Sequence, residues 1–211
     1  MVTEHCYLGG FIGNADAERD WLRKKIQGWS ESVKVLAGVA HKHPQSAYAG
    51  LQNFLKQEWA VVQRVTPGVG EVFGPVEEAL REIFVPGLFK GLREGVPERE
   101  NTCLPVKQAG LALSDPIQTA PENWTASCVI IGHVVEALRG QVEFRTADHL
   151  ACLREGRTAV RKRGEIRAEE ALTAALERYP VLQARRMRRA AKTGAWIMVL
   201  PSTANGTDLG D

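Results

Sequence analysis

The sequence predicts a mainly α-helical protein, built of helical bundles with one or two short extended segments. Apolar residues recur every three or four positions over most of the 211-residue chain, as on the buried side of an amphipathic helix. Strand-like stretches are few and short. Apolar residues make up 44% of the chain, which is enough for a sizeable core. Helices packed against each other are therefore the expected architecture.

The chain divides into five segments by composition and pattern. They are a strand-like N-terminal remnant (1–13), a thumb-like bundle of three helices (14–92), a linker with a short extended motif (93–117), a basic helical subdomain (118–194), and a short strand with a polar tail (195–211). Glycines interrupt the apolar run of the first segment. This pattern favours either a short strand and a turn, or the end of a strand whose partners are missing.

The first bundle holds helices predicted over 15–42, 46–64 and 75–84. The first helix carries an apolar seam with heptad-like spacing, formed by Leu22, Ile26, Trp29, Val33, Leu36 and Ala40. His43 precedes a proline and ends this helix, because the residue before proline avoids helical backbone angles. Trp21 lies off the seam, and we expect it on an exposed surface.

Glycine, proline and charge cluster between residues 91 and 121, which predicts two loops around a short extended piece at 104–113. Beyond the linker, helices are predicted over 122–139, 147–163, 165–179 and 181–193, with Gly164 as the break between the second and the third. The run from Trp196 to Leu200 is typical of a terminal strand.

Charge is unevenly distributed along the chain. The total is only +2, but residues 154–192 contain 12 positive and 5 negative side chains, a net charge of +7. The candidate nucleic-acid-binding residues are Arg154, Arg157, Arg161, Lys162, Arg185, Arg186, Arg188, Arg189 and Lys192. Arginines at helical spacing suit phosphate oxygens. The same charges are also compatible with a solvated face, or with pairing to the acidic remainder of the chain.

Several classes of enzyme are not supported by the sequence. It has no nucleophile elbow, no phosphate-binding or dinucleotide-binding glycine loop and no Asp-Asp step, so we expect no catalytic residue and no cofactor. His149 and Cys152 stand at i, i+3, but zinc needs three or four ligands, and we expect no metal site.

The four cysteines form no CxxC pair, and we expect reduced thiols in buried or partly buried structural positions. No segment reaches the roughly 20 apolar residues of a membrane helix. Without a secretory signal, the expected location is intracellular, in the nucleus or the cytoplasm.

Three stretches are informative through their order and spacing: Tyr7–Gly13, Trp29–Pro67 and Leu104–Leu113. They resemble reverse-transcriptase-like proteins of eukaryotic retroelements. The first resembles the Leu-Gly motif after the catalytic strands, and the second resembles the thumb-like helices that come next. The third resembles a later element with Leu-Pro and Gly-Gly-Leu-Gly, and Pro201–Thr207 resembles the C-terminal extension.

The third stretch departs from the family in one respect, because Ala109 and Ala112 stand where the family tends to have glycine. This departure puts a tight backbone approach at that point in question.

The resemblance implies the region downstream of the catalytic palm, since nothing here matches the aromatic-x-Asp-Asp metal site. The chain would then be a fragment or a free-standing relic that helps to grip a template–primer duplex. We therefore predict a non-catalytic module that binds duplex RNA or DNA. The alternative is a structural or protein-interaction domain, whose surface would face the missing palm region or a second copy of the chain.

Overall fold

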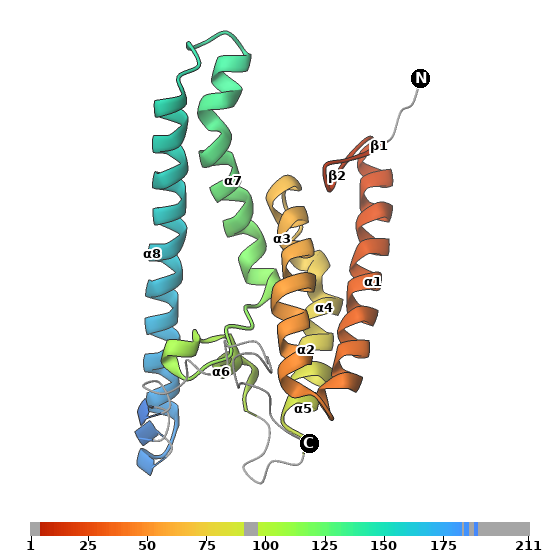
Figure 1. Cartoon of the computed structure of the whole chain (residues 1–211), viewed down its shortest axis with the longest axis vertical. Helices are drawn as coiled ribbons and strands as arrows, with labels where there is room; N and C mark the ends of the chain where they lie inside the picture. The colour runs from red at the N-terminus through yellow and green to blue at the C-terminus, as the bar shows by residue number, and fades with distance from the viewer. Residues whose placement is uncertain (1–4, 91–96, 183, 186–187, 190–211) are drawn as a thin grey trace, which may run out of the picture.

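The computed structural model describes residues 5–90, 97–182, 184–185 and 188–189, and the predicted mainly α-helical fold is confirmed (Figure 1). The strands and α-helices are β1 (His5–Tyr7), β2 (Gly10–Ile12), α1 (Ala15–Ala40), α2 (Pro44–Gly50), α3 (Lys56–Val65), α4 (Gly74–Ala79), α5 (Val85–Leu88), α6 (Arg99–Cys103), α7 (Pro116–Leu138) and α8 (Thr146–Arg178). The bundle of α1–α5 stands beside a long hairpin of α7 and α8 (Figure 1).

Helix α1 begins and packs as its sequence predicts. Asn14 caps it, because its Oδ1 accepts hydrogen bonds from the backbone N–H groups of Asp16 and Ala17 at 3.1 and 2.9 Å. The apolar seam is buried except at Leu36, which is half-buried. The expectation for Trp21 is wrong, since its ring is half-buried and stacks on Phe11 with 5.7 Å between centroids.

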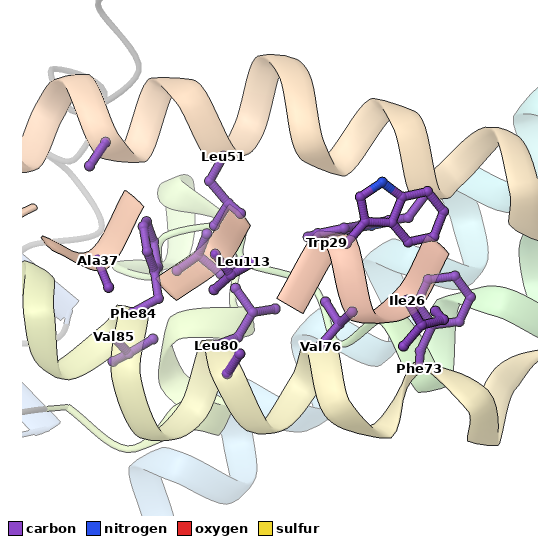
Figure 2. Packing of buried hydrophobic residues seen from close by; sticks show 14 of the residues in the cluster. Ile26, Trp29, Ala37, Leu51, Phe73, Val76, Leu80, Phe84, Val85 and Leu113 are labelled. Atoms are coloured by element: carbon purple, nitrogen blue, oxygen red, sulfur yellow. The ribbon is translucent and has the colours of Figure 1, made fainter. Parts of the chain in front are cut away.

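The core lies between α1 and two further rods, each a continuous run of helix. In the first rod a π-helical segment, η1 (Leu51–Leu55), joins α2 to α3, and in the second rod another, η3 (Leu80–Phe84), joins α4 to α5. A 3-10 turn, η2 (Gly70–Phe73), precedes α4. Figure 2 shows side chains from all three rods meeting, with Phe73 and Phe84 fully buried. Trp29 stacks on Phe73 with 6.0 Å between ring centroids.

The predicted helix 75–84 is longer in the structure and ends at Leu88. Pro86 does not stop it, because the five residues before it, Leu80–Phe84, are π-helical, and the changed hydrogen-bond pattern of that turn accommodates the proline.

The N-terminal segment forms a strand, a turn and a second strand. Strands β1 and β2 pair antiparallel, with Cys6 opposite Phe11. A Cβ atom added at Gly9 would lie 2.8 Å from a side-chain carbon of Val61 in α3. The hairpin therefore rests closely on the bundle.

The linker differs from its prediction. The stretch 104–113 is not a strand, but a 3-10 turn, η4 (Val106–Gln108), followed by a loop. Helix α7 begins at Pro116 rather than at 122, because Asp115 Oδ1 accepts the N–H of Ile117 at 2.8 Å and so caps the helix. Pro121 lies inside this helix without ending it.

The predicted break at Gly164 is wrong, because α8 is one helix of 33 residues. A single glycine costs a helix only about 1 kcal/mol, and the packing of α8 on α7 and α6 outweighs that cost. The strand predicted after Gly194 and the stretch Pro201–Thr207 lie outside the described residues. Of the predicted helix 181–193, the described positions are helical.

Candidate nucleic-acid interface

The half of α8 nearer its N-terminus carries exposed arginines at helical spacing. Arg154, Arg157 and Arg161, which we call the α8 stripe, are all exposed, and Lys162 is exposed beside them. Their spacing of three and four residues keeps them on one side of the helix over about 10 Å of its length. Between residues 154 and 163, five positive side chains stand against Glu155 alone.

The stripe differs in its pairing from Arg167 and Arg178, two arginines of the second half of α8. Arg167 Nη2 lies 2.5 Å from Glu122 Oε2 of α7, and Arg178 Nη1 lies 2.8 Å from Glu98 Oε2. These pairs fasten α8 to its neighbours. Within the described part of the chain, the arginines of the stripe and Lys162 form no ion pair. The alternative of pairing with the acidic remainder is therefore not seen for them, whereas a solvated face stays compatible with their exposure.

The second group of candidates is only partly described. Arg185, Arg188 and Arg189 are helical and exposed, whereas Arg186 and Lys192 lie outside the described residues. About 25 Å of α8 separates Arg161 from the end of this helix. That length carries the acidic side chains Glu165, Glu169, Glu170 and Glu177. The positive window thus consists of two clusters with an acidic stretch between them.

Metal-ligating residues are not gathered in the part of the chain that the structure describes. No group of three or more His, Cys, Asp or Glu side chains there could hold a metal ion. The expectation for the cysteines is wrong at Cys6 and Cys128, which are exposed, while Cys103 and Cys152 are half-buried. Among the described helices, none is long and apolar enough to cross a membrane.

Side chains of α2, η1 and α3 fix the loop at Leu111 and Ala112 through contacts that the sequence patterns do not predict. Tyr48 Oη donates to the Leu111 carbonyl at 2.6 Å, and Gln52 Nε2 donates to both carbonyls at 3.0 Å. Lys56 Nζ donates to the Ala112 carbonyl at 2.9 Å, and burial lowers its pKa. Three hydrogen-bonding side chains at intervals of four residues were the available signal, since such spacing places them on one side of a helix.

A buried ion pair holds the next residue of this loop. Arg99 Nε and Nη2 donate to the two carboxylate oxygens of Glu77 at 3.0 and 2.8 Å, and Arg99 Nη1 donates to the Leu113 carbonyl at 2.5 Å. Burial raises the pKa of Glu77, and the charge of Arg99 opposes that rise. Burial likewise raises the pKa of the neighbouring Cys103 thiol.

A buried glutamine links the bundle directly to the α7–α8 hairpin. Gln63 Nε2 donates to the Pro116 carbonyl at 2.8 Å, and Asn123 Nδ2 donates to Gln63 Oε1 at 2.7 Å. Because both ends of this buried amide are satisfied, the start of α7 is held in one orientation on the bundle. The hairpin that carries the α8 stripe is therefore fixed to the bundle at the start of α7.

The chain matches no family model, no curated protein and no solved structure. Its function must therefore be inferred from the geometry of its own residues.

Proposed function

We propose that the chain is a non-catalytic module that grips the phosphate backbone of duplex RNA or DNA through the arginines of α8. The observation that carries this proposal is the exposed α8 stripe, whose three guanidinium groups have no carboxylate partner among the described residues. Phosphates of one strand follow each other by about 3.4 Å along a duplex, so a stripe of about 10 Å matches roughly three of them.

The close packing of α8 on α7 favours the same function. Gly156 of α8 lies so close to α7 that an added Cβ atom would approach a side-chain carbon of Ile130 to 2.7 Å. This contact and the Arg167–Glu122 pair hold α8 on α7. Cations on a fixed helix lose less conformational freedom on binding than cations on a mobile segment.

The expectation of a duplex, rather than another anion, rests on the resemblance to the region after a retroelement palm. Ala109 and Ala112 stand where that family tends to have glycine, and their φ angles are 65° and 52°. Glycine adopts this left-handed conformation most readily. The backbone thus has the shape that a glycine-rich element would take, which supports the proposed kinship.

A charge-reversal experiment tests the proposal. Arg154→Glu, Arg157→Glu and Arg161→Glu are combined in one variant, and binding to labelled RNA and DNA duplexes is measured by fluorescence anisotropy. A matched control reverses Lys24, Lys25 and Lys42, which are exposed on and just after α1. We expect at least a tenfold loss of affinity for the α8 variant alone, independent of base sequence. Equal affinity in the two variants would refute the assignment of the stripe.

The second cluster is tested in the same way. Reversing the charges of Arg185, Arg188 and Arg189 should also weaken binding, because their exposed side chains add to the same positive field. Retained affinity in that variant would remove the second cluster from the interface and leave the α8 stripe alone in it.

A second candidate function, a structural or protein-interaction domain, is favoured by exposed apolar side chains on α7. Leu138 is 83% exposed and Ile131 is 46% exposed. If this were the whole function, the chain would self-associate in a salt-insensitive manner and bind no duplex. Light scattering at several protein concentrations, combined with the anisotropy assay, separates the two functions.

A further inference from the structure

A pocket of about 440 Å³ lies where the α7–α8 hairpin meets the bundle. Residues of α4, α6, α7 and α8 line this space, which we call the junction pocket. The arginines of the α8 stripe are not among its lining residues. Its volume is within the range of about 300–1,000 Å³ that is typical of small-molecule sites. The junction pocket is therefore a candidate site that the proposed duplex binding does not use.

The α8 wall of the junction pocket is built of small residues. Val160, Gly164, Ala168 and Ala171 line it, and their spacings of four, four and three residues place them on one side of the helix. A Cβ atom added at Gly164 would meet nothing within 4 Å, so close packing does not require a glycine at this position. A glycine inside a helix lowers its stability relative to alanine. What Gly164 provides in return is open space beside an apolar wall.

The other walls carry ionisable side chains with a negative excess. Four carboxylates line the junction pocket, against three guanidinium groups. Two of the guanidinium groups are hydrogen-bonded to carboxylates. Arg99 holds Glu77, and Arg167 holds Glu122. These two pairs cancel each other's charge.

The remaining charges leave Asp115 without an ionic partner. Arg81 Nη1 lies 3.6 Å from Glu100 Oε1, so these two side chains also balance. Asp115 caps α7 through its Oδ1, but within the described residues it forms no ion pair. Burial raises the pKa of Glu77 and that of Cys103, and the charge of Asp115 adds to both rises. The junction pocket therefore holds one uncompensated negative charge, on Asp115.

We propose that the junction pocket binds a small organic cation, an amine whose ammonium group pairs with Asp115 and whose apolar body packs on the small residues of α8. A cation removes the negative excess of the pocket, whereas an anion would add to it. A bare metal ion does not suit the pocket, since no group of three or more His, Cys, Asp or Glu side chains in the described part of the chain could hold one. The Gln63–Asn123 hydrogen bond and the Arg99–Glu77 pair fix the walls, so the site is formed before the ligand arrives.

Three probes of similar size and different charge test the class of ligand. Near neutral pH tryptamine is a cation, tryptophol is its neutral counterpart and indole-3-acetate is an anion. Their binding to the isotopically labelled full chain is followed by the NMR chemical shifts of backbone amides. We expect tryptamine to bind saturably, with a dissociation constant of about 1 mM or below, and to shift the amides of Gly164 and Asn123 but not that of Gly28 in α1. Tryptophol and indole-3-acetate should bind at least roughly fivefold more weakly.

Two variants test the position of the ligand. Asp115→Asn removes the charge and keeps the cap of α7, because asparagine caps helices as well as aspartate does, and it should weaken tryptamine binding about tenfold. Gly164→Leu places a side chain in the pocket and should abolish binding. The matched control is Gly28→Leu, where an added Cβ atom also meets nothing within 4 Å, and it should leave binding unchanged. Circular dichroism verifies that each variant keeps its helices.

Three results would overturn the inference. The first is tryptamine that does not bind saturably at the junction pocket, and the second is indole-3-acetate that binds as tightly as tryptamine. The third is a folded Asp115→Asn or Gly164→Leu variant that binds tryptamine as the native chain does. Duplex binding is measured separately, by anisotropy with the variants of the α8 stripe, so failure of this inference and failure of the proposed function are distinguishable.

Discussion

Among the glycines that the structure describes, Gly110 is the position at which a single added carbon should damage the fold most. A Cβ atom there would lie 2.0 Å from the carbonyl oxygen of Leu104, and 2.5 Å from its Cβ. An ordinary contact requires about 3.4 Å or more, so the backbone of the loop would have to move by more than 1 Å. The Ala112 N–H donates to that Leu104 carbonyl at 2.8 Å and would lose its partner. Overpacking of about 1–3 kcal/mol and the lost hydrogen bond of about 1 kcal/mol together predict a loss near 3 kcal/mol for Gly110→Ala.

Urea unfolding followed by circular dichroism measures this loss as a shift of the midpoint at constant slope. The matched control is Gly28→Ala, because Gly28 is exposed in the middle of α1 and an added Cβ atom there meets nothing within 4 Å. The control should gain about 1 kcal/mol from the better helix propensity of alanine. A loss below about 0.5 kcal/mol for Gly110→Ala would refute the close approach at Leu104.

Three further changes test α6 and the loop after it, which connect the bundle to the α7–α8 hairpin. Ala109→Gly should raise the free energy of unfolding by about 0.5 kcal/mol, because relief of the left-handed backbone outweighs the added chain entropy; a lower melting temperature would contradict this. Arg99→Met should cost about 3–5 kcal/mol in urea unfolding because it leaves Glu77 buried and unpaired, and adding Glu77→Gln should restore part of the loss. The pKa of Cys103 is raised above 9.0, so the folded state holds the thiol proton more tightly and stability falls as pH rises through the folded pKa. Cys103→Ala should therefore show a smaller loss of stability above pH 9.0 than the native chain, and an equal loss would exclude this thiol as its source.

The bundle was predictable because the residues within each stretch of sequence identify its helix and the face that is buried. The seam of α1 faces one side, and its spacing identifies both the helix and the buried face. Asp115 followed by Pro116 is a typical helix start, but the glycines, prolines and charges between residues 91 and 121 predict a loop there. Gly164 does not break α8, since its cost of about 1 kcal/mol is small beside the packing of a 33-residue helix.

The loop from residue 104 to residue 113 was not predictable because distant residues determine its shape. Tyr48 donates to the Leu111 carbonyl from 63 positions earlier in the chain. Spacing rules describe neighbours on one element, and they contain no information on which distant carbonyl a side chain reaches.

The candidate site was predictable only as a set of residues. Sequence alone places Arg157 and Arg167 in one basic window, but the structure pairs Arg167 with Glu122 and leaves Arg157 exposed. Whether an arginine meets a carboxylate depends on the approach of two helices, here α7 and α8. The spacing of the stripe came from the sequence, while its exposure and its lack of ion pairs among the described residues came from the structure.

The salt dependence of duplex binding tests the central claim most directly. The logarithm of the binding constant is plotted against the logarithm of salt concentration for the native chain and for the combined variant Arg154→Gln, Arg157→Gln and Arg161→Gln. Each phosphate contact contributes about 0.9 to the slope, so the variant should lose between two and three units of slope if all three arginines contact phosphates. An unchanged slope, or a native chain that binds no duplex at low salt, would contradict the claim that the α8 stripe grips a nucleic-acid backbone.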